Sequence, residues 1–358
     1  MTKRIVVAMS GGVDSSVAAC LLKESGYEVI GVTMRIWRRE EEGQPNRCCG
    51  AADVEDARRV AQQLGIPFYA VNLEEEFERE VIRYFCEEYE RGRTPNPCIL
   101  CNEKVKFGVL LKKALDLKAD GLSTGHYARL TRDEGSGRYL LKKGIDPRKD
   151  QSYVLFSLTQ EQLRLTLFPL GEYRKEEVRK RALQLSLRVH DKPESQEVCF
   201  IQESSYHSFL SQRLKDSIGP GPMVDKNGTV LGRHKGIPFY TIGQRRGLGL
   251  AKGKPLYVIR IDRPRNTVVV GEERETYCDR FVVDSVNWVL PQKMNPSFST
   301  QVKIRYNHPG SEALLYPKGE REVEVKFITP QKAVTPGQAA VFYDGDTVLG
   351  GGWIKEVI

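Results

Sequence analysis

Hydrophobic positions in the first third of the chain follow two alternating patterns. Short apolar runs of strand length recur at 5–9, 29–33, 68–71 and 121–125. Between these runs, apolar residues return every three or four positions, which predicts helices after residue 16 and at 53–64, 73–91 and 105–117. Strands that alternate with helices through short connections are typical of an α/β fold. The pattern therefore predicts a doubly wound parallel sheet.

The pattern changes near residue 206. Glycine and proline then punctuate short segments with little helical periodicity, which predicts a small, loop-rich domain. Beyond about residue 277, apolar and polar residues alternate over short strands with turns between them, as in a small antiparallel β-barrel. A chain of 358 residues exceeds one typical core. We therefore predict three domains, at 1–205, 206–276 and 277–358.

The first strand leads into a loop with the composition of an anion-binding site, Ser10-Gly11-Gly12-Val13-Asp14-Ser15. Glycines let the backbone approach a phosphate, hydroxyls add donors, and the following helix offers free N–H groups. A Walker loop would continue with a lysine for the outer phosphates, and none follows here. A loop without that lysine suits reaction at the α-phosphate, in which pyrophosphate leaves and AMP passes to an oxygen nucleophile. The competing interpretation is a strand-to-helix turn whose glycines serve geometry alone.

Other residues are expected at the same edge of the sheet. Ligands of a doubly wound sheet bind outside the carboxyl ends of its strands. Met34 follows the second strand, and Gly125 and His126 follow a later one. We expect these residues to flank a bound nucleotide, although a methionine at such a position is often only a packing residue.

The chain is basic, with 55 Lys and Arg against 47 Asp and Glu. The surplus is concentrated at 206–271, where 12 basic residues face 3 acidic ones. A positive region confined to one segment is typical of a protein that holds a polyanion such as RNA.

No stretch resembles a membrane span or a signal peptide, so we expect a cytoplasmic protein. Its eight cysteines are then expected to be reduced, catalytic or metal-binding.

Three cysteines are candidates for chemistry. Cys98 and Cys101 form a C-x-x-C pair in a loop with two prolines, and Cys199 lies in a turn-rich stretch. Such thiols could be redox-active, half of a zinc site, or ligands of an iron–sulfur cluster. Zinc is disfavoured because the sequence has no second C-x-x-C and no H-x3–5-H. We assign packing roles to Cys20 and Cys86, and no catalytic role to Cys48, Cys49 and Cys278.

Nine short motifs together resemble a known family from end to end. They are S-G-G-V-D-S at Ser10–Ser15, T-P-N-P-x-x-x-C-N at Thr94–Asn102, T-G-H-Y at Thr124–Tyr127, K-D-Q-S-Y at Lys149–Tyr153, C-F-I at Cys199–Ile201, T-I-G-Q-R-R-G-L-G at Thr241–Gly249, Arg305-Tyr306, P-G-Q at Pro336–Gln338 and L-G-G-G at Leu349–Gly352. On these motifs the chain resembles the bacterial tRNA-specific 2-thiouridylases, which belong to the PP-loop ATP pyrophosphatase superfamily. The resemblance implies an enzyme that makes 2-thiouridine at the wobble position of tRNA.

The resemblance also implies the sites. ATP, with Mg²⁺, would be bound by Ala8, Met9, Ser10, Gly11, Gly12, Val13, Asp14, Ser15, Met34 and Gly125. The enzyme would adenylate the uracil C2 oxygen, and a persulfide on Cys199, supplied by a sulfur-donor protein, would displace AMP. Cys101 would release the sulfur and leave a Cys101–Cys199 disulfide. Asn96, Pro97 and Cys98 would meet the target base. Contacts with tRNA would come from His126, Lys149, Asp150, Gln151, Arg305, Tyr306 and Gln338.

Cys98 departs from the family pattern, because many members have aspartate at this position. Related thiolases hold a [4Fe–4S] cluster with three cysteines, so the sequence also predicts Cys98, Cys101 and Cys199 as cluster ligands. Two further hypotheses come from other classes. One is an ATP-dependent ligase or amidotransferase with the same loop, and the other is an RNA-binding or iron–sulfur protein whose loop is vestigial.

Overall fold

The computed structural model describes residues 2–36, 51–193, 198–201, 206–215, 219–250, 253–291 and 297–358. Cys48 and Cys49 lie outside the described residues. The chain divides into two compact units. The first contains Met1–Ile82, Cys98–Gln202 and Asp346–Val348, and the second contains Arg83–Pro97, Glu203–Gly345 and Leu349–Ile358.

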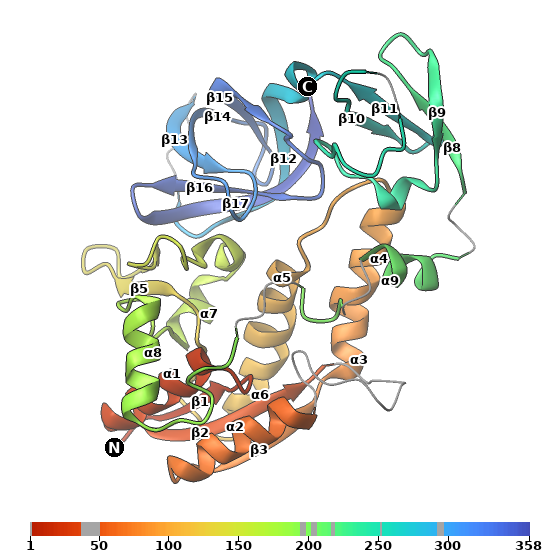
Figure 1. The fold of residues 1–358 in the computed structure, drawn as a ribbon. Helices are drawn as coiled ribbons and strands as arrows, with labels where there is room; N and C mark the ends of the chain where they lie inside the picture. The colour runs from red at the N-terminus through yellow and green to blue at the C-terminus, as the bar shows by residue number, and fades with distance from the viewer. Residues whose placement is uncertain are drawn as a thin grey trace. The chain divides into compact units, whose positions relative to one another are not determined.

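A five-stranded parallel sheet forms the centre of the first unit, in the order β3-β2-β1-β4-β7 (Figure 1). The strands are β1 (Arg4–Ala8), β2 (Glu28–Arg35), β3 (Phe68–Asn72), β4 (Gly121–Ser123) and β7 (Thr166–Leu167). The chain builds outwards from β1 to β3 and then returns to add β4 on the other side of β1. This arrangement confirms the predicted doubly wound sheet, and its order reverses between β1 and β4.

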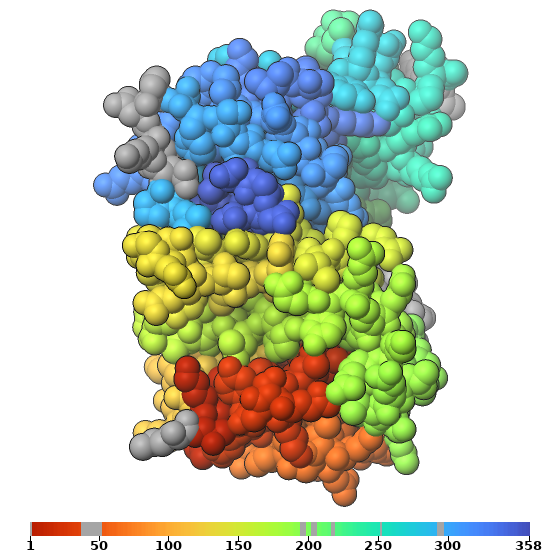
Figure 2. Space-filling view, turned by 90° about the vertical axis from the view of Figure 1, so that its left-hand side faces the viewer, coloured from red at the N-terminus to blue at the C-terminus, as the bar shows by residue number. Residues whose placement is uncertain are grey.

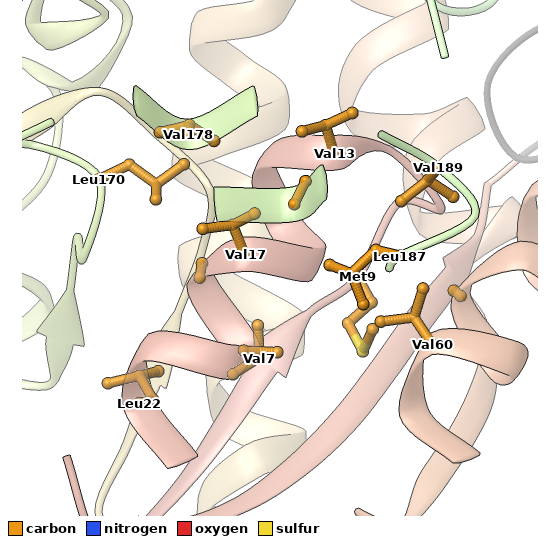
Figure 3. Packing of buried hydrophobic residues seen from close by; sticks show 14 of the residues in the cluster. Val7, Met9, Val13, Val17, Leu22, Val60, Leu170, Val178, Leu187 and Val189 are labelled. Atoms are coloured by element: carbon orange, nitrogen blue, oxygen red, sulfur yellow. The ribbon is translucent and has the colours of Figure 1, made fainter. Parts of the chain in front are cut away.

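Helices α1 (Val13–Glu24), α2 (Ala51–Gln63) and α8 (Lys175–Gln184) contribute to one apolar core with the sheet. Figure 3 shows Val7 of β1, and Met9 just after it, among side chains from α1, α2 and α8. Leu187 and Val189, which follow α8, pack into the same core. Each fully buried aliphatic side chain here is worth about 1.5–3 kcal/mol. The segment after α8 is therefore anchored beside the strand that leads into the glycine loop.

Two long helical regions contain π-helical turns. The region predicted as one helix at 73–91 consists of α3 (Glu74–Phe77), π-helical η1 (Glu78–Ile82) and α4 (Arg83–Glu90). The helix predicted at 105–117 begins earlier, as α5 (Pro97–Leu100), continues as π-helical η2 (Cys101–Leu110) and ends as α6 (Leu111–Asp116). π-helical turns are rare in proteins, and those that occur are often at functional sites. The position of Cys101 as the first residue of η2 therefore supports its candidacy as a functional residue.

The remaining elements of the first unit follow β4. A hairpin is formed by β5 (Ala128–Arg132) and β6 (Tyr139–Lys143), with Gly137 at φ +69° in its turn. A 3₁₀ turn, η3 (Ser152–Leu155), precedes α7 (Gln160–Arg164), which Thr159 and Gln162 cap reciprocally. In the space-filling view of Figure 2, the N-terminal segment (red) lies beside the light-green segment that includes α8. These segments are also joined by an ion pair of 2.5 Å between Arg181 and Glu24.

The central part of the second unit is more regular than the sequence predicts. It starts with helix α9 (Tyr206–Arg213) and contains a four-stranded sheet in the order β10-β11-β8-β9. Its strands are β8 (Gly221–Val224), β9 (Val230–His234), β10 (Tyr257–Asp262) and β11 (Thr267–Gly271), with a 3₁₀ turn η4 (Ile237–Phe239). Met223, Val258, Val268 and Val270 form its core. The expectation of a loop-rich segment missed this sheet, because its strands are short and β8 pairs in parallel with the distant β11.

The predicted C-terminal barrel is confirmed. After a 3₁₀ turn η5 (Glu273–Thr276), six strands pair in the order β12-β15-β14-β13-β16-β17, and β12 pairs with β17 to close the barrel. The strands are β12 (Tyr277–Trp288), β13 (Phe298–Lys303), β14 (Ser311–Pro317), β15 (Val323–Lys332), β16 (Ala339–Asp344) and β17 (Thr347–Val357). Phe281, Val302, Leu315, Val325 and Phe342 are among the buried residues that fill it. No helix of the described residues is long and apolar enough to cross a membrane.

Candidate active site

The glycine loop between β1 and α1 has a geometry that only glycine satisfies at one position. Gly11 has φ +72°, and a Cβ at this residue would lie 2.2 Å from the Asp53 carbonyl oxygen of α2. Gly12 is the extended N-cap of α1 (φ −100°, ψ 169°). Ser16 Oγ donates to the Gly12 carbonyl at 2.8 Å, and Ser15 Oγ accepts from the Ser10 N–H at 3.1 Å. The loop thus brings the N-terminus of α1 to the carboxyl end of β1.

Asp14, in the first turn of α1, is held by two residues from distant parts of the chain. Lys175 Nζ donates to both carboxylate oxygens, at 2.7 and 2.8 Å, and the Tyr127 hydroxyl donates to Oδ1 at 2.7 Å. Lys175 is itself buried, and its backbone N–H donates to Asp146 Oδ2 at 3.1 Å. Lys175 belongs to none of the sequence motifs, and Tyr127 is only the last residue of one of them. No local spacing signals these contacts, since both partners are more than 100 residues from Asp14.

A half-buried lysine beside the loop, Lys192, has no role in any of the sequence motifs. Lys192 Nζ lies 3.0 Å from the Gly11 carbonyl oxygen, 2.7 Å from Asp53 Oδ1 and 2.7 Å from Asp56 Oδ2. Partial burial lowers the pKa of Lys192, but the hydrogen bonds and charges of Asp53 and Asp56 outweigh it, and the pKa is raised. The ammonium is therefore charged at neutral pH.

Gly125 follows β4, and Met34 lies near the carboxyl end of β2. A Cβ on Gly125 would be 2.8 Å from both the Asp14 carbonyl carbon and the Ser15 nitrogen, so glycine allows the loop after β4 to reach the start of α1. Met34 is partly exposed. The neighbouring Thr33 hydroxyl donates to the Met9 carbonyl at 2.7 Å. Both strand ends therefore meet the glycine loop within the first unit.

Cys98 and Cys101 belong to one helical stretch of the first unit and differ in exposure. Cys98 in α5 is exposed, whereas Cys101 at the start of η2 is buried. The protein around it and then the neighbouring Cys101 raise the pKa of Cys98 to about 11, while Lys106 opposes them. Water that reaches the exposed thiol reduces the size of this shift without changing its direction. Burial also raises the pKa of Cys101, and the positive charge of Lys106 opposes that rise.

Lys106 has a fixed position near these thiols. Its ammonium donates to Asn102 Oδ1 at 3.0 Å, and the Asn102 amide donates to the Val154 carbonyl at 2.9 Å. Asn102 is 1% exposed, so Lys106 is positioned by a buried side chain. Lys106 is the cation that favours the thiolate form of both cysteines. It is a third functional candidate that the sequence analysis did not identify.

Cys199 is partly exposed in a turn at 198–201, and the ring of the next residue, Phe200, packs edge-on against Phe77 at 5.7 Å. The described cysteines, namely Cys20, Cys86, Cys98, Cys101, Cys199 and Cys278, are all free thiols. The Cys101–Cys199 disulfide implied by the resemblance is thus not formed among them. Cys20 and Cys86 are buried, as their packing roles require.

The iron–sulfur prediction is not supported. Within the described ranges, which include all three candidate thiols, no group of three His, Cys, Asp or Glu side chains is placed to hold a metal ion. Cys98, Cys101 and Cys199 therefore do not fit a cluster, which needs its thiolates within about one iron–sulfur bond of shared iron atoms. The geometry of the described residues therefore gives the cluster assignment no support.

His126 is buried behind the thiol-bearing helix. Its ring lies between Phe107 and Phe168, with centroid distances of 6.1 and 6.0 Å, and its Nδ1 is 2.7 Å from the Thr124 hydroxyl. Burial and then the charge of Lys106 hold the pKa of His126 well below its usual value. The imidazole is therefore neutral at physiological pH and suits hydrogen bonding rather than binding of phosphate by charge.

The residues predicted at 149–151 form a braced loop. Asp150 is buried, and its carboxylate accepts from the Gly144 N–H at 3.2 Å and from the Ser152 N–H and hydroxyl at 3.0 and 3.1 Å. Gln151 Oε1 accepts from the Tyr127 N–H at 2.9 Å, and the Gln151 N–H donates to the Tyr127 carbonyl at 2.9 Å. Asp150 thus shapes the loop, and Gln151 links it to the tyrosine that binds Asp14. Lys149 is partly exposed at its start.

The other predicted tRNA positions belong to the second unit. Gln338 Nε2 donates to the Thr94 carbonyl at 2.8 Å, and the Thr94 N–H donates to the Pro336 carbonyl at 2.9 Å. These bonds tie the barrel turn at Pro336 to the loop that contains Asn96 and Pro97. Arg305 and Tyr306 follow β13 in a turn rather than within a strand, and Arg305 Nη1 donates to the Lys332 carbonyl at 3.0 Å.

Comparison with known proteins identifies the family. Residues 3–203 match the tRNA methyl transferase HUP domain model, 207–272 the tRNA methyl transferase PRC-barrel domain model, and 278–354 the aminomethyltransferase beta-barrel domain model. A solved 4-thiouridine synthetase–RNA complex with bound ATP aligns with 60% of the chain and 51% of its own length, at 19% identity and a TM-score of 0.38, which is too low to support an argument.

Curated relatives are far more similar. The chain is 51% identical over 355 residues to the tRNA-specific 2-thiouridylase MnmA of Halothermothrix orenii, and the alignment covers 99% of each protein. It is 52% identical over 364 residues to the enzyme of the same name from Symbiobacterium thermophilum, covering 100% of this chain and 93% of the relative. The chain therefore belongs to the tRNA-specific 2-thiouridylase family and is a tRNA sulfurtransferase.

Proposed function

We propose that this enzyme replaces the C2 oxygen of the wobble uridine of tRNA by sulfur, in two steps that consume ATP. In the first step the uracil C2 oxygen attacks the α-phosphate of ATP, a C2–O–AMP bond forms, and pyrophosphate leaves. In the second step sulfur adds to C2 and AMP leaves with the original oxygen. The observation that supports this assignment best is the glycine loop at the point where the strand order of the sheet reverses.

ATP binding by this loop has a direct physical basis. The N-terminus of α1 presents free N–H groups and the positive end of the helix dipole, both of which favour phosphate. Gly11 and Gly125 leave no room for side chains where the loops after β1 and β4 meet. Mg²⁺ would accompany the nucleotide as its phosphate-bound ion. The residues that we assign to ATP are Ala8–Ser15, Met34 and Gly125.

For sulfur transfer we assign the persulfide to Cys199 and the resolving thiol to Cys101. A sulfur-donor protein would first convert the Cys199 thiol to a persulfide. The outer sulfur attacks C2 and expels AMP, which leaves the base joined to Cys199 through a disulfide. The Cys101 thiolate then attacks the Cys199 sulfur, the 2-thiouridine leaves, and a Cys101–Cys199 disulfide forms. A thiol reductant supplies the two electrons that restore both thiols.

We assign tRNA binding to residues of both units, at Asn96, Pro97, Cys98, His126, Lys149, Asp150, Gln151, Arg305, Tyr306 and Gln338. The contacts described above suggest that some of these residues shape binding loops and that others touch RNA. Asp150 and Gln338 are engaged with their own chain, so we expect them to shape binding loops. Lys149, which is partly exposed, and Tyr306, which is 36% exposed, are better suited to touch RNA. We also propose a cytoplasmic location, where tRNA and the sulfur donor are present.

The test is nucleoside mass analysis of tRNA after incubation with enzyme, ATP, Mg²⁺ and a persulfide donor. We expect 2-thiouridine and one pyrophosphate per modified base. Cys101→Ser and Cys199→Ser should each release pyrophosphate with tRNA yet form no thiouridine, while Cys278→Ser should behave as wild type. Pyrophosphate release that needs a small carboxylate instead of tRNA would favour a PP-loop ligase and contradict the proposal.

A further inference from the structure

Lys192 makes an unusual contact for a lysine beside an ATP loop. Its ammonium lies within hydrogen-bond distance of three oxygens, and two of these belong to Asp53 and Asp56 of α2. The third is the carbonyl oxygen of Gly11, at 3.0 Å. The two carboxylates more than balance the single positive charge. Lys192 is therefore poorly suited to replace the phosphate-binding lysine of a Walker loop. Its ammonium binds the loop backbone instead, at the Gly11 carbonyl.

Several hydrogen bonds hold the backbone around Lys192. Arg179 of α8 donates to the His190 carbonyl at 3.1 Å and to the Lys192 carbonyl at 3.4 Å. The Lys192 N–H donates to the Val189 carbonyl at 3.1 Å, and Val189 is buried in the core shown in Figure 3. Hydrogen bonds thus hold both the backbone of Lys192 and the ammonium at the end of its side chain. Such a contact can hold the loop in one orientation before a ligand arrives.

The orientation of one peptide follows from this contact. In a trans peptide the C=O and the N–H point in opposite directions. Because Lys192 fixes the Gly11 carbonyl on its own side, the N–H of Gly12 points away from Lys192. Gly12 is the N-cap of α1, so this N–H lies at the end of the helix that favours anions. Because this peptide joins two glycines, few steric barriers would otherwise stop it from rotating.

We propose that Lys192 is a positioning residue for the ATP loop, which orients the Gly11–Gly12 peptide so that the Gly12 N–H can donate to a phosphate of ATP. The inference rests on the proposed ATP site and adds to it a residue that touches no nucleotide. It assigns to Asp53 and Asp56 the task of holding the ammonium in place.

The test uses calorimetry to compare how tightly the full chain binds ATP, pyrophosphate and adenosine. In Lys192→Met we expect affinity for ATP and pyrophosphate to fall about tenfold or more, the equivalent of one lost hydrogen bond to a charged group. Adenosine affinity should not change. Lys192→Arg should restore part of the loss. Lys23→Met is the matched control, because Lys23 also donates to a backbone carbonyl of the first unit, that of Leu64, but does not contact the loop.

Asp56→Asn is a second variant in case Lys192→Met fails to fold. It leaves the lysine and Asp53 in place, so we expect a smaller loss that is again confined to the phosphate-containing ligands. Unchanged pyrophosphate binding in folded Lys192→Met would overturn the inference, as would an equal loss for adenosine. A wild-type protein that binds neither ATP nor pyrophosphate would instead overturn the proposed function, and this inference with it.

Discussion

Lys175 and Asp14 form a two-pronged ion pair of 2.7 and 2.8 Å across 161 residues of sequence. Lys175 is the first residue of α8 and Asp14 lies in the first turn of α1. The ammonium also lies 5.8 Å from the centre of the Tyr127 ring, whose hydroxyl binds the same carboxylate. Asp14 therefore has a structural role in addition to its expected role at the phosphates.

Asp14→Ala should reduce stability as well as ATP binding. From sequence alone, a loop aspartate would be expected to leave the fold intact when it is removed. In the structure its loss removes the carboxylate that binds the buried ammonium of Lys175, which costs up to about 3 kcal/mol once the partial exposure of Asp14 is allowed for. We expect a lower midpoint of thermal unfolding, together with loss of tRNA-dependent pyrophosphate release.

Glu24→Ala is the control for this prediction, because it removes the exposed ion pair between the same two helices. Surface pairs are worth about 0–1 kcal/mol, so its midpoint should hardly move and its ATP binding should be normal. An Asp14→Ala protein as stable as Glu24→Ala would show that Lys175 finds another partner.

Cys98→Asp should keep thiolation activity near the wild-type level. The change places the residue common in the family at an exposed position, and the persulfide route gives Cys98 no obligatory redox task. Cys101→Ser and Cys199→Ser should form no thiouridine. The assay is nucleoside mass analysis beside iron analysis of the purified wild type. Loss of activity in Cys98→Asp, together with bound iron in the wild type, would restore the cluster mechanism.

Alkylation of Cys98 and Cys101 should depend on pH, and Lys106 should shift that dependence to lower pH. The raised pKa values of Cys98 and Cys101 keep both thiols protonated at neutral pH, so their reaction with iodoacetamide should be slow and accelerate as pH rises. Lys106→Met removes the charge that favours the thiolates and should move both profiles to higher pH. Rates can be followed by peptide mass spectrometry.

Lys104→Met is the control for Lys106→Met, since Lys104 lies on the same helix but is exposed and paired with Glu103. Its alkylation profiles should match the wild type. Profiles that stay unchanged in Lys106→Met would mean that Lys106 serves only to hold Asn102.

Arg245 and Arg246 should contribute to tRNA affinity through phosphate charge. Both are exposed in the basic segment at 206–271. Replacing both by alanine should weaken tRNA binding and flatten the slope of log affinity against log salt by up to about two units. Filter binding at several salt concentrations measures the slope. Arg58→Ala with Arg59→Ala, which pair with Glu55, should leave it unchanged.

The sequence predicts those parts of the fold that depend on local pattern. The strand–glycine–helix junction at 4–24 and the alternation in the barrel are local, and the structure has both. The π-helical η2 leaves no trace in apolar spacing, because its widened turns differ from an α-helix by less than one residue per turn. The sheet of the central part depends on β11 pairing with β8, which lies more than 40 residues away.

The candidate site divides in the same way. The loop residues Gly11 and Gly12 could be recognised because glycine is required where they stand. Lys175, Tyr127, Lys192 and Lys106 could not, because a lysine or tyrosine at a helix end has many possible uses until tertiary contacts select one. Asp150 is the opposite case. Its place in a motif predicts a contact with tRNA, but its carboxylate accepts hydrogen bonds from its own loop.

The bonds between Gln338, Pro336 and Thr94 have a consequence for protein synthesis. Gln338 donates to the Thr94 carbonyl across 244 residues, and a Cβ on Gly337 would lie 2.9 Å from the Thr94 nitrogen. The loop at 94–97 is therefore made early by the ribosome, whereas these contacts with residues 336–338 form only when the last strands of the barrel emerge. A nascent or truncated chain that ends before residue 336 would have its parallel sheet and glycine loop complete while the loop expected to meet the target base still lacked its brace, so the order of synthesis itself would delay RNA modification until the whole chain is made.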